Sequence, residues 1–290
     1  MHFAPSHRAR TSSGATPTVV SGRYGARLGR AITIAGLAAL AAGFLVGGIG
    51  SRLAMRLVTV LGDPADIGRL TEAQARVGDI TFGGTTFLVV SVTMISTVIG
   101  AITYVAAGPV LRGRPLARGL EFGAILLLAL GSQVISADNF DFAEFATPAV
   151  TVGLFAVLFV VFGIVAVIVA DRLEQRLPSI GTGRGTDAGY WAILLIGSGV
   201  VLLMVVGAVG SRADPVAIVA IGVVVGYAAL ARTTNARWVT AVGWAVVAVA
   251  VLPSGIGLMG EVVNIIGDAN TSDAVHSMGA HAAVSGVVGR

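Results

Sequence analysis

The hydrophobic residues of this 290-residue chain come in long uninterrupted blocks rather than in amphipathic stripes. Seven blocks are long enough to cross about 30 Å of hydrocarbon as helices that rise about 1.5 Å per residue. They lie near residues 31–50, 82–107, 120–136, 149–170, 190–210, 215–231 and 239–259. No stretch between them is long enough to bury a core of its own. The pattern therefore predicts an all-α fold, a polytopic transmembrane helix bundle of about seven spans.

Composition agrees with a membrane protein and narrows its source. Hydrophobic residues make up 55% of the chain and charged residues only 12%. All 19 basic residues are arginine, which indicates a GC-rich coding bias and hence a bacterial plasma membrane. The net charge of +4 is modest and the arginines are scattered, so a nucleic-acid partner is excluded.

The arginines near the span ends set the expected orientation, because cytoplasmic loops carry the excess of basic residues. With the N-terminus inside, 13 of the 19 arginines lie inside, in the N-terminal tail and the loops 108–119, 171–189 and 232–238. The acidic residues show the opposite bias, since 11 of 15 lie outside. The prediction is an N-terminus inside and a C-terminus outside.

The two ends of the chain are predicted to lie outside the helical domain, which covers residues 31–263. Residues 1–30 hold five arginines among Ser, Thr, Gly and Pro, a composition typical of a disordered basic cytoplasmic tail. A cleaved signal peptide is the rival interpretation, disfavoured because apolar sequence continues past Ala42 to Ile49. Residues 264–290 are expected to form a flexible outer tail, with a short interfacial helix over 274–288 as the alternative.

Two arginines follow the first apolar block at the predicted outer face of the membrane, where basic residues are less common than at the inner face. Arg52 and Arg56 are four residues apart and share a helix face, about 31 and 37 Å along a helix that starts at Ala31. The structural interpretation is that both side chains reach the outer lipid phosphates. The functional one is an anion-recognising vestibule, because guanidinium groups suit carboxylate and phosphate.

A weak internal repeat extends this candidate ligand site. Gly50-Ser51-Arg52, Gly131-Ser132-Gln133 and Gly210-Ser211-Arg212 follow one another at intervals of 81 and 79 residues. A true repeat would place their third residues at one depth, and repeats often frame the central site of a transporter. The speculative ligand-binding set is therefore Arg52, Arg56, Gln133 and Arg212.

The loop after the first span contains a candidate polar network. Thr71 and Gln74 have the spacing of a capping box that opens a short helix. Acidic and basic residues of the same loop are expected to pair with one another and with the arginines of the first span. Single surface pairs contribute only about 0 to 1 kcal/mol, so an ordered loop requires the whole network. Its members are Thr71, Glu72, Gln74, Arg76 and Asp79.

The second block is rich in hydroxyl residues, which have two interpretations. Thr93, Ser96, Thr97 and Thr103 either support close helix packing or line a polar pathway, and packing is favoured. In the outer loop 138–145, acids alternate with phenylalanines. Aromatic anchoring at the interface is favoured there over a cation site.

The residue types exclude most catalytic chemistry. Cysteine and lysine are absent, and the four histidines, His2, His7, His276 and His281, all lie in the two tails. No span therefore offers a Ser-His pair, a Schiff-base lysine, a haem ligand or a histidine-based zinc site. No catalytic residue, metal or cofactor is expected.

The stretch from Gly47 to Phe87 combines a Gly-x-Gly-Ser-Arg-x-x-Met-Arg span end with a Thr-Glu-x-x-Ala-x-Val-Gly connector. Over these roughly 40 residues it resembles uncharacterised multi-pass membrane proteins of actinobacteria and related bacteria. The matching residues are Gly48, Gly50, Ser51, Arg52, Met55, Arg56, Thr71, Glu72, Ala75, Val77 and Gly78. The resemblance implies a family but no activity.

The functional expectation is a non-enzymatic structural or accessory membrane component. A transporter or permease for a small, perhaps anionic, solute is the alternative, and an enzyme using outer carboxylates is the least favoured class. The expected partners are the lipid bilayer and either another membrane protein or a second copy of this chain.

Overall fold

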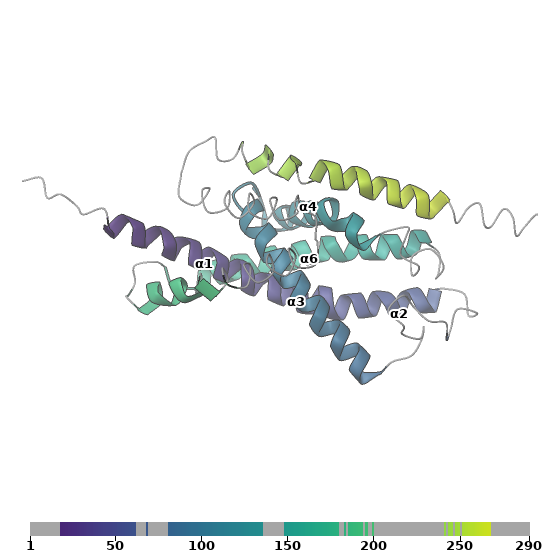
Figure 1. The fold of residues 1–290 in the computed structure, drawn as a ribbon, viewed down its shortest axis with the longest axis horizontal. Helices are drawn as coiled ribbons and strands as arrows, with labels where there is room; N and C mark the ends of the chain where they lie inside the picture. Colours follow the sequence, from purple (N-terminus) through teal and green to yellow (C-terminus); the bar gives the residue numbers. More distant parts are fainter. Residues whose placement is uncertain are drawn as a thin grey trace, which may run out of the picture.

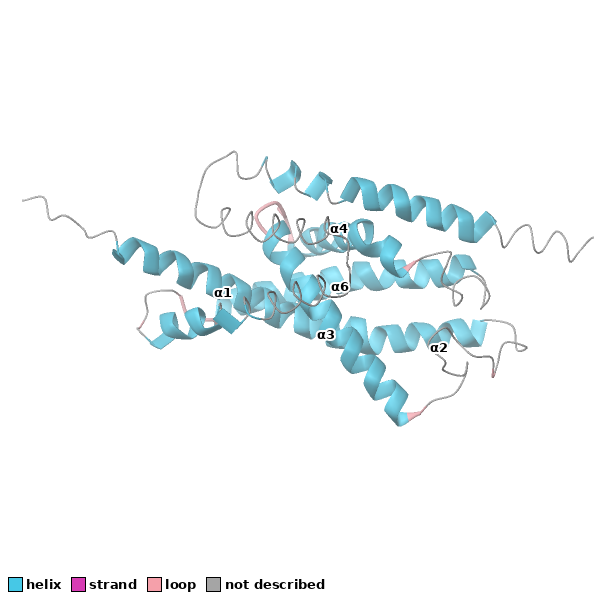
Figure 2. Ribbon diagram, viewed as in Figure 1, coloured by secondary structure: helices cyan, strands magenta, loops and turns pink. Residues whose placement is uncertain are grey.

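Helices make up the regular structure of the described chain. The structure is a computed structural model. It describes residues 18–61, 81–135 and 148–179, together with Gly68 and parts of 183–199 and 241–267. These residues form helices and connecting turns, with no strand among them (Figure 2). The predicted all-α class is confirmed for this part of the chain.

Five helices are long and apolar enough to cross a membrane. They are Ala26–Leu61, Phe82–Ala107, Pro115–Val134, Ala149–Arg176 and Gly243–Gly267. They correspond to five of the seven apolar blocks. The other two blocks, 190–210 and 215–231, lie mostly outside the described residues, so a count of seven stays a prediction.

The first span is longer than the apolar block that predicts it. It consists of α1 (Thr18–Ala42), a π-helical segment η1 (Gly43–Gly50) and α2 (Ser51–Leu61). The helix begins at Thr18, inside the segment predicted to be a disordered tail, and residues 1–17 lie outside the described residues. At the far end the helix continues through both arginines of α2, as expected. A helix of 36 residues is about 54 Å long, which exceeds the hydrocarbon thickness of about 30 Å.

Helix α6 (Pro148–Arg176) lies at the centre of the described bundle. It packs most extensively against α4 (Pro115–Val134) and also against α1, η1 and α2. Helix α3 (Phe82–Ala107) packs against α1 and η1. Figure 1 shows α1 and α6 running along the long axis of the molecule, with α3 crossing them obliquely.

Glycines bring α4 and α6 into backbone contact. A Cβ atom added at Gly163 would meet the backbone of Gly119 and Gly123, lying 2.6 Å from Gly123 Cα. Cβ atoms at Gly119 and Gly123 would each lie 2.7 Å from a Cα atom of α6, in Ile164 and Val160. Lipid tails are as apolar as these side chains, so close packing made possible by small residues drives helix association.

A second close approach joins η1 to α3. A Cβ atom at Gly47 would lie 2.7 Å from Ser96 Oγ, and one at Gly48 would lie 2.7 Å from Thr93 Oγ1. The Thr93 hydroxyl is buried and donates a hydrogen bond to the carbonyl of Gly43 at 3.4 Å. Glycine on one helix thus makes room for a hydroxyl side chain on the other.

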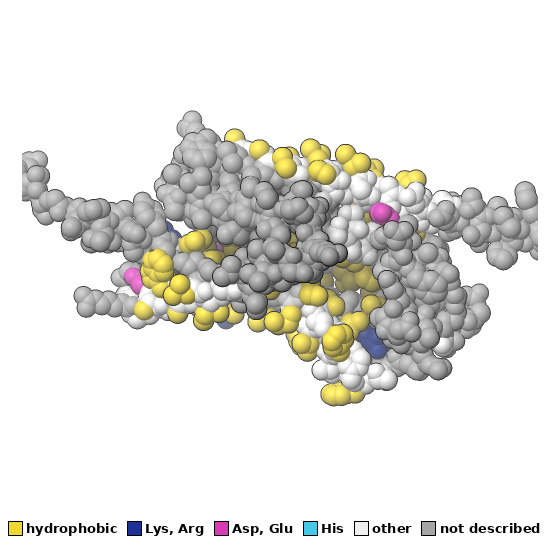
Figure 3. All heavy atoms as spheres, viewed as in Figure 1, with side chains coloured by type: hydrophobic (Ala, Val, Ile, Leu, Met, Phe, Trp, Pro, Cys, Tyr) yellow, Lys and Arg dark blue, Asp and Glu magenta, His cyan; other side chains and the backbone are white. Residues whose placement is uncertain are grey.

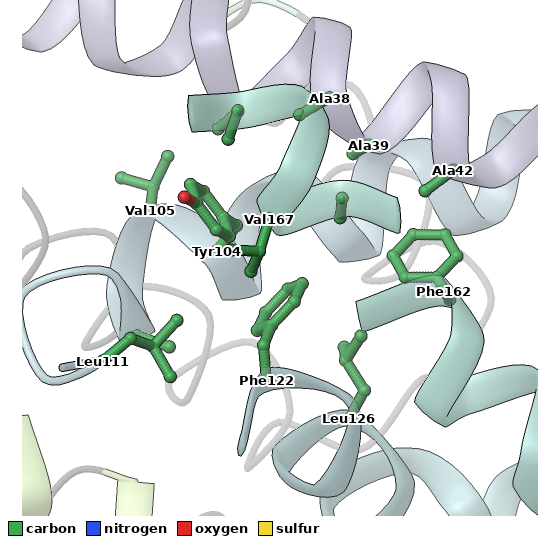
Figure 4. Close-up of a cluster of buried hydrophobic side chains, with 14 of the residues drawn as sticks. Ala38, Ala39, Ala42, Tyr104, Val105, Leu111, Phe122, Leu126, Phe162 and Val167 are labelled. Carbon is green, nitrogen blue, oxygen red and sulfur yellow. The ribbon is translucent and has the colours of Figure 1, made fainter. Parts of the chain in front are cut away.

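The main core lies where α1, α3, α4 and α6 meet. Helix α1 contributes mainly alanines, and the other helices contribute the larger side chains, including Phe122, Phe162 and Val167 (Figure 4). Small residues on α1 therefore allow the larger side chains of α4 and α6 to fill the shared interior. A smaller cluster of Ile135, Leu258 and Ile265 joins the end of α4 to the C-terminal helix (Gly243–Gly267).

The C-terminal helix runs in the same direction as α4. A Cβ atom at Gly255 would lie 3.6 Å from Leu128, and one at Gly131 would lie 2.8 Å from Leu258. Ile265 follows further along and joins Ile135. Residue numbers thus rise together along both helices. The C-terminal helix begins toward the end of the bundle at which α4 begins.

The outer surface of the described helices is strongly apolar. Exposed side chains include Leu53, Val90, Met94, Val157 and Ile256. Figure 3 shows hydrophobic side chains along the flank of the molecule, with the visible charged side chains mostly toward its two ends. This distribution suits helices surrounded by lipid.

The backbone contact at Gly163 predicts a position-dependent effect of alanine. Gly163→Ala should destabilise the protein by about 1 to 3 kcal/mol, because the added methyl group meets backbone that has no side chain to move aside. Gly153→Ala in the same helix is the matched control, since nothing lies within 4 Å of its added Cβ. Thermal unfolding in detergent would measure both. Equal melting temperatures for the two variants would contradict the interface.

Candidate functional site

The polar residues with the most complete geometry lie where three spans end together. Helix α3 ends at Ala107, α4 begins at Pro115, and the seven residues between them turn the chain back. Gly113, in this turn, has a φ of +105°, a conformation that favours glycine. Pro115 stands at the first turn of α4, where its missing N–H costs nothing. We call this region the Arg118 end of the bundle.

An ion pair connects α4 to α6 at this end. Arg118 Nη1 donates to Asp171 Oδ1 at 3.0 Å, and the two side chains are 21% and 19% exposed. Arg118 Nη2 also donates to the hydroxyl of Tyr104 on α3, at 3.5 Å. One guanidinium group therefore joins three helices. Its Nε is buried and has no hydrogen-bond partner among the described residues.

Tyr104 is positioned by the hydrophobic core. Its ring meets the ring of Phe122 edge to face, with centroids 5.2 Å apart and planes at 82°. Both residues are buried, and Figure 4 shows them beside Val167 of α6. Packing of this kind fixes the ring and hence the place of its hydroxyl.

A cavity of about 200 Å³ lies beside these groups. It is lined by Tyr104, Gly108, Pro109, Arg118 and Glu174. The lining thus includes a guanidinium group, a phenol hydroxyl and a carboxylate. The Glu174 carboxylate has no hydrogen-bond or ion-pair partner in the described part of the chain. The cavity therefore offers groups of both charges at the ends of three spans.

Arg30 holds the C-terminal end of α6 against α1. Its guanidinium donates to the carbonyls of Glu174 at 2.8 Å, Leu177 at 3.4 Å and Pro178 at 3.2 Å. The hydroxyl of Tyr190 donates to the Pro178 carbonyl as well, at 2.8 Å. The last carbonyls of a helix lack partners within the helix, and arginine both satisfies them and complements the helix dipole. Arg30 thereby fixes the backbone position of Glu174.

Three of the four predicted ligand-binding residues lie in the described part of the chain. Arg52 and Arg56 are half-buried on α2, and Gln133 is exposed near the end of α4. None of the three side chains has a hydrogen bond or ion pair in the described part of the chain. Arg212 lies outside the described residues, so the four-residue site stays a prediction.

The first span and α4 both run antiparallel to α6. Gly50 packs against Leu158, so the residues that follow it lie toward the first turns of α6. The register of Gly119 with Ile164 and Gly123 with Val160 places Gln133 beside the first turn of α6. Arg56, six residues or about 9 Å beyond Gly50, therefore lies near the level of Gln133, and Arg52 lies one to two turns short of it.

The predicted loop network lies outside the described residues, and so does the capping box expected within it. Its members are Thr71, Glu72, Gln74, Arg76 and Asp79. A helix cap that is described lies further along, where the Thr81 hydroxyl accepts a hydrogen bond from Gly84 N at 3.1 Å. This bond explains why the second span begins at Phe82, as predicted.

The hydroxyl residues of α3 bond mainly to their own helix. Ser96, Thr97 and Thr103 each donate to the carbonyl four residues earlier, at 2.6, 2.6 and 2.8 Å. Thr93 bonds across to Gly43 in η1. These hydroxyls are therefore satisfied where the helices pack, in agreement with the packing interpretation.

Comparison with protein-family models, with curated proteins and with solved structures finds no match to this chain. The resemblance of residues 47–87 to actinobacterial membrane proteins therefore stays a prediction.

From the sequence alone, Arg118 and Asp171 are expected only as charged residues of loops on the inner face of the membrane. The signal that could have paired them is their position: Arg118 directly precedes one apolar block and Asp171 directly follows another, at the same predicted face. Opposite charges at adjacent span ends are candidates for an ion pair. Tyr104 and Glu174 give no such signal, because their place depends on how the helices cross.

The ion pair predicts a measurable coupling between the two helices. In a double-mutant cycle with Arg118→Gln and Asp171→Asn, we expect a coupling energy of about 1 kcal/mol, between that of exposed pairs and that of fully buried ones. Arg172, exposed on the same turn of α6, provides the control substitution Arg172→Gln. Thermal unfolding in detergent would give the energies. Additive effects of the two substitutions would show that the pair contributes nothing.

Proposed function

We propose that this chain is a multi-pass protein of a bacterial plasma membrane with a non-enzymatic structural or accessory role. The observation that carries the proposal is the use of polar groups within the described spans. The hydroxyls of Thr93, Ser96 and Thr97 in α3 are bonded to backbone carbonyls, and the glycines of η1, α4 and α6 close the helix contacts. These spans use their polar and small residues for packing rather than for a water-filled pathway.

The proposal includes seven spans, with the N-terminus inside. Helix α6 ends at the Arg118 end, where Arg30 holds its last carbonyls. The C-terminal helix begins toward the same end, because it runs parallel to α4. We infer that the connection between these two helices leaves and returns to one membrane face, and an even number of crossings fits this arrangement. The apolar blocks 190–210 and 215–231 would supply two.

One observation favours the alternative of a transporter for a small, perhaps anionic, solute. The first span contains an eight-residue π-helical segment, Gly43–Gly50, directly before Arg52. Segments of π-helix within longer helices are frequent at functional sites. A solute pathway in this region would require the arginines of α2, which have no side-chain partner among the described residues, to line a shared aqueous space.

Cysteine labelling separates the two functions, since the natural chain has no cysteine. Single variants Arg52→Cys, Arg56→Cys, Gln133→Cys and Arg212→Cys would be treated from outside with a membrane-impermeant maleimide. For the structural role, we expect every position to react quickly and phosphate or carboxylate ions to have no effect. Ala54→Cys, buried between the two arginines on α2, is the matched slow control. Slow reaction of all four positions, slowed further by small anions, would favour the transporter instead.

Reporter fusions test the even number of crossings. Alkaline phosphatase fused after Arg184 and after Arg237 should be inactive, and fused after Arg212 it should be active, because only exported phosphatase folds. Green fluorescent protein at the same positions should give the opposite pattern. Activity after only one of Arg184 and Arg237 would contradict the shared face. Inactivity at all three positions would leave five spans rather than seven.

A further inference from the structure

We propose that the cavity beside Arg118 binds the head group of a phospholipid that carries both a phosphate and a primary ammonium group, as phosphatidylethanolamine does. The proposal adds a ligand to the proposed membrane component and rests on its location in a bilayer. It does not depend on whether the protein is an accessory subunit or a transporter.

The phosphate would bind at the guanidinium of Arg118. This group has five N–H donors, and two of them have partners among the described residues, Asp171 and Tyr104. The remaining donors of the Nη atoms and the positive charge suit a phosphate oxygen. The Asp171 carboxylate offsets part of that charge. The site is therefore suited to a phosphodiester with a single negative charge rather than to a doubly charged phosphate.

The ammonium group would bind at Glu174. This carboxylate lines the same cavity, is exposed, and has no partner in the described part of the chain. The backbone of Glu174 is held by Arg30, so the carboxylate is carried on a fixed helix end. A primary ammonium group donates hydrogen bonds to a carboxylate, whereas the quaternary ammonium of phosphatidylcholine has no N–H to donate. Glu174 thus gives the site a chemical preference between two zwitterionic lipids.

The position and size of the cavity favour a lipid as the source of this head group. Its lining comes from the last turns of α3 and α6 and the first turn of α4, where the spans end and phospholipid head groups lie. Its volume of about 200 Å³ is smaller than the roughly 300 Å³ at which pockets for drug-sized ligands begin. A head group fits this space, while its acyl chains extend along the apolar flank of the bundle. Free glycerophosphoethanolamine has the same phosphodiester and ammonium groups but no such chains.

Native mass spectrometry of the full-length protein in detergent tests the proposal. The delipidated protein would be titrated with dioleoyl phosphatidylethanolamine, phosphatidylcholine and phosphatidylglycerol, and separately with glycerophosphoethanolamine. We expect phosphatidylethanolamine to bind with a Kd at least about tenfold lower than the other two lipids, as one hydrogen-bonded charge pair allows. Free glycerophosphoethanolamine should bind much more weakly than the lipid.

Single substitutions test whether the preference for phosphatidylethanolamine arises in the cavity. Glu174→Gln should remove the preference over phosphatidylcholine, because it removes the negative charge and leaves the backbone contact with Arg30 in place. Glu121→Gln is the matched control, an exposed acid on α4 near the same end that does not line the cavity. Tyr104→Phe keeps the ring packing and removes the hydroxyl, so it should weaken all three lipids together. Circular dichroism would check that each variant is folded.

Three results would overturn the proposal. They are equal binding of phosphatidylethanolamine and phosphatidylcholine, equal effects of Glu174→Gln and Glu121→Gln, and binding of free glycerophosphoethanolamine as tight as that of the lipid. The last result would assign the cavity to a soluble ligand. The cysteine labelling at Arg52 and the fusion reporters do not involve this cavity. Failure of the proposed function would therefore appear in those two experiments, and failure of the lipid site would appear only in the lipid titrations.

Discussion

The described bundle depends on backbone contact between α4 and α6. Gly163 faces Gly119 and Gly123, and no side chain separates the two helices at this point. In hydrocarbon, exclusion of water does not drive helices together, so the closeness of packing decides which helices associate. The same contact brings Arg118, next to Gly119, within 3.0 Å of Asp171. A glycine interface within the span thus determines the position of a charged pair at its end.

The contact between η1 and α3 follows a related rule with polar groups added. Glycines of η1 face Thr93 and Ser96, and the hydroxyls are bonded to carbonyls rather than to one another. A hydroxyl without a partner is costly in hydrocarbon, whereas one bonded within its own helix can lie at a packed interface. The hydroxyl-rich second span is therefore compatible with close packing.

Two carboxylates one turn apart on α6 have different surroundings. Asp171 is paired with Arg118 across the helix interface, while Glu174 is exposed and faces the cavity. Arg30 holds the backbone at this turn through three carbonyls, so the difference between the two acids is built into a fixed helix end. Charges at this position suit helices that end at a membrane surface, where water and head groups are near. This arrangement combines a structural ion pair with groups that remain available to a ligand.

The sequence by itself determined the helical class, five of the spans now described, and the concentration of charge at the span ends. These properties depend on local hydrophobicity and length, which each segment carries alone. It did not determine the start of the first helix at Thr18, the π-helical segment, or the cavity at Tyr104, Arg118 and Glu174. It also gave no means of separating the levels of Arg52 and Gln133, because the register between helices is absent from a linear pattern. Only the tertiary structure decides these features, since side chains far apart in sequence meet according to where glycines let the helices approach.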